Sequence, residues 1–106
     1  MAHPEAEAEL ESAIDYLLQH AGSDVAITYI DAIDHATAQI VEAPNSWQVY
    51  FDVPAEPAIR KKGVRKFTYN IFYQPREYVI WFLAYANTKR RPNYWADRLK
   101  TFIPQP

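Results

Sequence analysis

Cationic and aromatic side chains lie together in one short run near the end of the chain: Arg90, Arg91, Tyr94, Trp95 and Arg98. Guanidinium groups bind phosphates and carboxylates, and aromatic rings stack on bases or fill protein interfaces. The run is therefore a candidate surface for binding a nucleic acid or a protein. Alternatively, Tyr94 and Trp95 cover the edge of a sheet. Trp95 would then be packed in the core, and Arg90 and Arg91 would be exposed to solvent beside it.

Acid–base chemistry has few candidate groups in this part of the chain. Cleavage of RNA through its 2′-hydroxyl needs a proton acceptor, a proton donor and cations for the phosphate. Histidine is the usual choice near neutral pH, but the histidines lie in the first 59 residues, where we expect them to be solvated: His3, His20 and His35. The nearby acids are Glu77, in a predicted turn, and Asp97, an ordinary surface charge. What remains is a tyrosine activated by neighbouring cations: Tyr94 with Arg90, Arg91, Arg65 and the lysines Lys61 and Lys62.

Charge is divided sharply between the two halves of the chain. Residues 1–59 contain eleven acids and no Lys or Arg, whereas residues 60–106 contain all eleven bases and two acids. Such asymmetry indicates one surface built for a polyanion or an acidic partner. The alternative is a solvated acidic helix pair that precedes a basic sheet.

Length and composition limit the class of protein. A chain of 106 residues predicts one domain, residues 1–106, with a single core. The absence of cysteine excludes disulfides, thiolate zinc sites and cysteine catalysis. With only two glycines there is no glycine-rich phosphate loop, and no His or Cys ligands cluster, so we expect neither metal nor cofactor. No secretory signal or membrane-length apolar run is visible, which predicts a cytoplasmic protein.

The spacing of apolar residues predicts two helices in the N-terminal half. Residues 5–21 form the first, and a second ends near Glu42, with Ser23 or Asp24 as its cap. The short link at Gly22 predicts an antiparallel helical hairpin. The predicted buried faces comprise Ala6, Leu10, Ala13, Ile14, Leu17 and Leu18, then Ala26, Tyr29, Ile30, Ile33, Ala36 or Thr37, and Ile40.

The second half has the pattern of short strands. We predict strands at residues 47–51, 64–67, 69–74 and 78–86, with a hairpin turn at 75–77. Arg65 and Lys66 would alternate across the second strand, and the apolar run 78–86 predicts a central strand buried on both faces. Pro92 is expected to open a last short helix through Leu99. The predicted fold is α+β: a helical hairpin packed on a small, mainly antiparallel sheet, with a short C-terminal helix.

Two segments of this half resemble the signature of the RelE/ParE superfamily of bacterial toxins. They are VRKFTYNIFY at 64–73 and YVIWFLAYANTKRRPNYW at 78–95, followed by Arg98. Members typically show a basic strand, a Tyr-x-Ile-x-Tyr strand, an apolar strand and a closing His-x-x-Arg-Arg-Pro-x-Tyr-Trp-like segment. The predicted hairpin and sheet match the family's fold, so the resemblance covers nearly the whole chain. Two features depart from it: Asn87 stands where many members carry His, and the net charge is slightly negative.

The resemblance implies the toxin of a toxin–antitoxin pair, with plasmid stabilisation as its setting. One branch cleaves messenger RNA in the ribosome, and the ParE-like branch poisons DNA gyrase. RelE-like ribonucleases carry an arginine where Asn70 stands here, and the glutamate and C-terminal histidine of other nucleases have no clear counterpart. We therefore favour gyrase inhibition by binding rather than catalysis, through Arg90, Arg91, Tyr94, Trp95 and Arg98. The alternatives are a ribosome-dependent mRNA endoribonuclease and an inactive member that only binds its antitoxin.

A cognate antitoxin is the partner that the resemblance implies. Antitoxins of this class wrap their toxin with a helix and an extended segment and are often acidic. The basic half of the chain is a suitable receiver, with contacts expected at Arg65, Lys66, Arg90 and Arg91. Association should then be slower at high salt.

Overall fold

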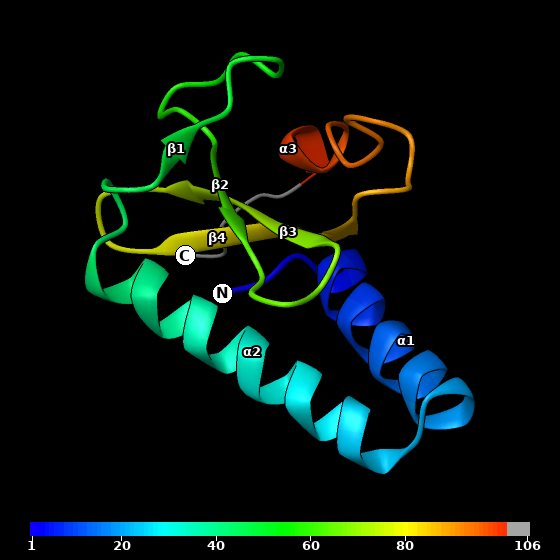
Figure 1. The fold of residues 1–106 in the computed structure, drawn as a ribbon. Helices are drawn as coiled ribbons and strands as arrows, with labels where there is room; N and C mark the ends of the chain where they lie inside the picture. Colours follow the sequence, from blue (N-terminus) through cyan, green and yellow to red (C-terminus); the bar gives the residue numbers. More distant parts are fainter. Residues whose placement is uncertain (102–106) are drawn as a thin grey trace.

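The computed structural model describes residues 1–101 and places two helices and a short C-terminal helix around a four-stranded sheet (Figure 1). The elements are α1 (Pro4–His20), α2 (Ser23–Glu42), β1 (Gln48–Val49), β2 (Arg60–Gly63), β3 (Tyr69–Pro75), β4 (Ile80–Asn87) and α3 (Arg98–Thr101). The strands pair antiparallel in the order β1-β2-β3-β4. The predicted α+β fold is confirmed. No helix in the described part of the chain is long and apolar enough to cross a membrane.

The link between α1 and α2 depends on glycine. Gly22 has a φ of 95°, which side-chain-bearing residues rarely adopt, and its amide donates to the Leu17 carbonyl at 3.0 Å. Gly22 is also the residue before α2, with no side-chain cap, so the prediction of a cap at Ser23 or Asp24 is wrong. The start of α1 is capped instead by His3, whose Nδ1 accepts from the Glu5 amide at 3.1 Å. His3 is buried, which corrects the prediction that all three histidines are solvated.

The sheet carries a hydrophobic cluster on each face. On the hairpin side, Tyr29 and Ile33 of α2 pack with Ile71 and Tyr73 of β3. On the opposite face, the buried members come from the end of the β1–β2 connection, β3, β4 and the C-terminal segment: Ile59, Phe72, Trp81, Leu83, Ala84, Ala86 and Trp95. The sheet is therefore the middle layer between the helical hairpin and the segment that follows β4 (Figure 1).

A β-bulge decides which side chains of β4 reach each cluster. The β3–β4 register shifts so that Leu83 has no Cα partner on β3. Because of this extra residue, Leu83 and Ala84 both belong to the cluster on the C-terminal side, whereas Phe82 and Tyr85 belong to the cluster under the hairpin. As predicted, β4 is buried on both faces, but it is an edge strand rather than a central one.

The outer edge of β4 is covered by the start of the chain. Residues 1–3 run parallel to it: the Phe82 amide donates to the Met1 carbonyl and the His3 amide donates to the Phe82 carbonyl, each at 2.9 Å. Farther along, the Tyr85 amide donates to Glu9 Oε1 of α1 at 3.2 Å. These contacts satisfy backbone groups that an open sheet edge would leave unpaired.

Two predicted elements lie elsewhere. The basic run Arg60–Gly63 itself forms the second strand, and residues 64–67 are outside it. Arg65 and Lys66 lie in the β2–β3 turn, where Lys66 has a left-handed φ of 70° that a strand does not allow. The segment after Pro92 consists of successive turns, and the last helix begins only at Arg98.

Candidate binding cleft

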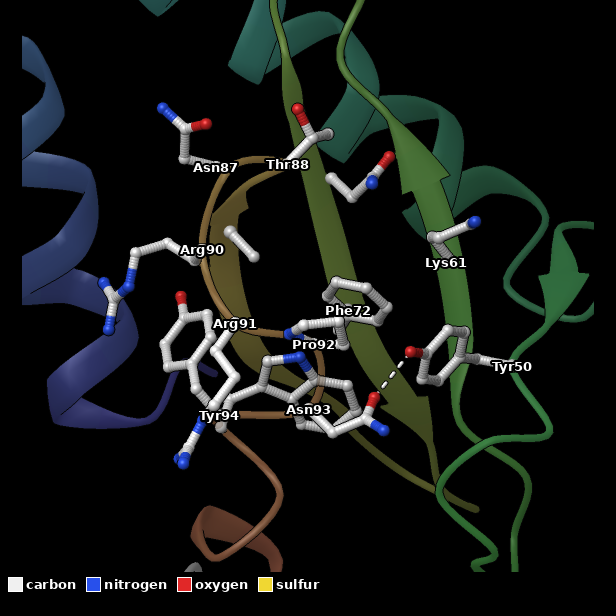
Figure 2. Close-up of a pocket in the computed structure, with 13 residues that line it drawn as sticks. Tyr50, Lys61, Phe72, Asn87, Thr88, Arg90, Arg91, Pro92, Asn93 and Tyr94 are labelled. Atoms are coloured by element: carbon white, nitrogen blue, oxygen red, sulfur yellow. Dashed lines mark hydrogen bonds between the residues drawn. The ribbon is translucent and has the colours of Figure 1, made fainter.

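A cleft of about 160 Å³ opens on the sheet face opposite the helical hairpin (Figure 2). The stacked rings of Phe72 and Trp95, with centroids 4.6 Å apart, lie against it. One wall comes from β2 and the loop after β1, the other from the segment after β4. The lining residues are Tyr50, Lys61, Asn70, Phe72, Ala86, Asn87, Thr88, Arg90, Arg91, Pro92, Asn93, Tyr94 and Trp95.

The cleft is cationic. Its lining residues, all in the described part of the chain, include Lys61, Arg90 and Arg91 and no Asp or Glu. Both arginines are exposed. The Tyr50 hydroxyl donates to Asn93 Oδ1 at 2.5 Å, a bond that joins the two walls (Figure 2). Arg90 also borders a second hollow, beside α1, that Glu5 and Glu9 line. The joined walls and the exposed cations suit the binding of an anionic group.

Tyr94 is held by α1. Its hydroxyl donates a short hydrogen bond to Glu9 Oε2, and the Arg90 guanidinium lies 3.9 Å from the centre of its ring. Burial raises the pKa of Tyr94 far above its ordinary value. The hydrogen bond to Glu9 and its charge raise this pKa further, whereas Arg90 and Arg98 lower it less. The phenol therefore keeps its proton at neutral pH, where it cannot serve as a base.

Arg98 does not line the cleft but anchors the C-terminal segment beside it. The guanidinium binds both oxygens of the Glu9 carboxylate, at 2.9 and 3.0 Å, and lies 3.3 Å from the Glu5 carboxylate. It also donates to the carbonyl of Leu83, the bulge residue of β4, at 2.9 Å. Arg98 thus helps to close the outer edge of β4 and positions the turns that carry the cleft's second wall.

The remaining predicted site residues divide between two regions. Trp95 is only 1% exposed and forms part of the core, as expected. Arg65 and Lys66 lie beside α2, where they line a groove with Ala32 and His35. The structure therefore brings Arg90, Arg91, Tyr94 and Trp95 together at the cleft and leaves Arg65 and Lys66 apart from them.

Asn87 stabilises the turn that follows β4. Its side-chain oxygen accepts from the Lys89 amide at 2.9 Å, which ends β4 and starts the turn toward the arginine pair. Asn70, where RelE-like ribonucleases carry arginine, lines the cleft as a neutral amide. Neither residue supplies a group that exchanges protons near neutral pH.

Two residues important to the site were not singled out from the sequence: Glu9 and Tyr50. Glu9 had a detectable signal, because it shares a helical face with Ala6 and Ala13, which are buried. An acid at the margin of a buried face requires a cationic or hydrogen-bonding partner. Its partners were not identifiable, because Tyr94 and Arg98 follow it by 85 and 89 residues.

The cleft combines cations and aromatic rings without a histidine or carboxylate among its described lining residues. In residues 1–101, no cluster of three or more His, Cys, Asp or Glu side chains is placed to hold a metal ion. Among protein families, a model described as the ParE toxin of the type II toxin–antitoxin system parDE matches residues 1–92. No curated protein gives a match.

Proposed function

Because the chain belongs to the ParE toxin family of type II toxin–antitoxin systems, we propose that it inhibits DNA gyrase by binding and that its cognate antitoxin neutralises it. The family implies the antitoxin partner. Gyrase as the target, plasmid stabilisation as the setting and the cytoplasm as the location are parts of the proposal. A gyrase-directed toxin must reach the enzyme and its DNA, and it needs a binding surface rather than a catalytic set.

The observation that carries this proposal is the chemistry of the cleft. Lys61, Arg90 and Arg91 line it beside aromatic rings, with the Arg90 guanidinium extending toward α1 (Figure 2). The hydroxyl of Tyr94 is bound to Glu9, and the pKa of Tyr94 is raised. Such a cleft attracts phosphates or carboxylates and offers no group poised to transfer a proton at neutral pH. This favours inhibition by binding over cleavage of RNA.

Within the proposed target-binding set, the residues have different tasks. Arg90 and Arg91 are exposed and would contact gyrase or its DNA, with Tyr94 fixing the position of Arg90 through their stacked contact. Trp95 and Arg98 are buried and would act by holding the segment in place. Loss of either buried side chain should therefore reduce inhibition through the structure of the segment.

For the antitoxin, we propose contacts at both cationic regions. Arg65 and Lys66 lie in the β2–β3 turn beside α2, whereas Arg90 and Arg91 lie at the cleft. One antitoxin can reach both regions only if it extends over the surface of the toxin. This requirement agrees with the helix and extended segment expected of antitoxins in this class.

The test is a supercoiling assay with purified gyrase and trapping of cleaved DNA. The intact protein should inhibit supercoiling, and Arg90→Ala with Arg91→Ala should weaken inhibition by roughly tenfold or more, as loss of charge-assisted contacts does. Lys89→Ala, an exposed neighbour outside the cleft, is the matched control. Tyr94→Phe should inhibit nearly as well as the wild type, since its hydroxyl is directed to Glu9.

Failure to inhibit at several-fold molar excess of folded protein would reject gyrase as the target. A parallel assay would then measure cleavage of messenger RNA on ribosomes. Cleavage that disappears in Tyr94→Phe would establish the ribonuclease alternative. Antitoxin binding without either activity would identify an inactive member.

A further inference from the structure

The outer side of α2 exposes apolar side chains, of which Ile30 was predicted to be buried. Ile30 is 37% exposed, and Ile27 and Val41 are 55% and 58% exposed. Together with Asp34 and Ala38 they follow helical spacing over 14 positions, so they form one continuous row, the α2 stripe. The row is about 21 Å long at the rise of an α-helix.

The α2 stripe faces away from the sheet. The opposite flank of α2 meets the sheet side of the molecule: the Gln39 carbonyl accepts from Trp47 Nε1 at 3.2 Å, and Ala32 and Ala36 lie beside β2 and the turn after it. In Figure 1, α2 lies along the outside of the molecule and diverges from α1 beyond the link at Gly22. Leu18, near that link on α1, is 50% exposed.

The helical hairpin that carries the α2 stripe contains acidic side chains but no Lys or Arg. Asp34 lies within the stripe, and the exposed Asp31 and Glu42 flank it. Residues 1–59 contain no Lys or Arg to offset them. A second copy placed hairpin to hairpin would oppose acids with acids, which is unfavourable. Asp31 shares a groove with Arg65 and Lys66, so the acids that remain for a cationic partner are Asp34 and Glu42, toward the C-terminal end of the stripe.

We propose that the α2 stripe docks an amphipathic helix of a partner protein whose polar face is rich in Lys and Arg. Apolar side chains of that helix would cover Ile27, Ile30 and Val41, and its cations would pair with Asp34 and Glu42. This surface is separate from the cationic cleft, and its charge preference is the reverse. The proposal is independent of gyrase as the target.

The probe is a fluorescent amphipathic peptide of about five helical turns with Leu on one face and Lys on the other. A second peptide replaces every Lys with Glu. Anisotropy titrations with the full chain measure both affinities at low and high salt. The variant is Ile27→Ser with Ile30→Ser, and Tyr78→Ser is the control, because Tyr78 is 91% exposed and lies in the β3–β4 connection. Circular dichroism confirms that each variant is folded.

We expect the Lys peptide to bind the wild type and the Tyr78→Ser control equally. It should bind the double variant roughly tenfold or more weakly, since two isoleucines leave the contact. Amide chemical shifts should move in α2 and not at the cleft. Equal affinity for the double variant, equal binding of the Glu peptide, or shifts confined to the cleft would each overturn the proposal. A dimer of the chain alone that the double variant abolishes would overturn it as well.

Discussion

At the scale of residues, Glu9 links three segments that are distant in the sequence. Its carboxylate binds Arg98 and Tyr94 of the C-terminal segment and accepts from the Tyr85 amide of β4. The side chains of Glu9 and Arg98 are only 14% and 10% exposed. In such a pair, removal of the Glu9 charge leaves Arg98 in a poorly hydrated place with only the exposed carboxylate of Glu5 nearby.

Glu9→Gln should therefore lower the free energy of unfolding by about 3 kcal/mol, since the change removes the charge but keeps the shape of the side chain. Urea unfolding measures this loss. Glu11→Gln is the matched control: Glu11 lies on the same helix and is exposed, so its change should stay within about 0.5 kcal/mol. If the two variants unfold at the same urea concentration, the carboxylate of Glu9 does not hold the C-terminal segment.

Sequence patterns identified the arginine and aromatic run and the packing of Trp95, but not which of its arginines is buried. Arg90 and Arg98 have the same side chain, yet Arg90 is exposed and Arg98 is buried. What separates them is contact with Glu9 and with the bulge carbonyl of Leu83. These contacts arise from tertiary packing, and local spacing carries no information about them.

At the scale of elements, the beginning of the chain completes β4. His3 serves twice, because its amide donates to Phe82 and its ring caps α1. The sequence predicted β4 as a central strand, since burial on both faces gives the same apolar run in either position. Its place at the edge is decided by backbone pairing with β3 and with residues 1–3. Such pairing leaves no hydrophobic pattern in the sequence, so it could not be predicted.

His3→Ala should destabilise the fold by about 1 kcal/mol through loss of the cap on α1, with the backbone pairing retained. Thermal unfolding gives the comparison. His35→Ala, at an exposed site on α2, should stay within about 0.5 kcal/mol of the wild type. A His3→Ala variant as stable as the control would show that the ring contributes nothing as a cap.

At the scale of the whole molecule, the two layers on the sheet enclose several tyrosines. Burial raises the pKa of Tyr29, Tyr85 and Tyr94, and it raises that of Tyr73 to about 12 while Arg60 lowers it less. The folded state thus holds phenolic protons that the unfolded chain releases near pH 10. Stability contributed this way is complete below pH 10 and is lost as pH rises toward the folded pKa.

Urea unfolding between pH 8 and pH 11 should therefore show a falling free energy of unfolding above about pH 10. Tyr73→Phe, which also loses the hydrogen bond to the Pro44 carbonyl, should start less stable but decline less steeply. Tyr78→Phe is the control, because Tyr78 is exposed. Equal slopes for the wild type and Tyr73→Phe would show that Tyr73 does not contribute to the alkaline transition.

The overall fold followed from the sequence because helical spacing, the Gly22 break and the change to strand spacing agree with one another. The prediction failed where backbone geometry alone decides, as at Lys66 with its left-handed φ and at the turns after Pro92. It also assigned Ile30 to the core, although this residue is 37% exposed. Helical spacing shows which face of a helix is buried but not how wide the buried face is. It therefore does not distinguish residues at the margin that are covered from those that stay exposed.

The contact between Glu9 and Arg98 also determines when the C-terminal segment can fold onto α1. It joins residues 89 positions apart, and contacts of long sequence separation form late because they close a large loop. During synthesis α1 emerges first, and Glu9 has no arginine partner until the last turns of the described chain have left the ribosome. The ring of Trp95 must arrive in the same final stretch. A nascent chain therefore lacks the cleft until residues 90–98 have emerged and joined α1.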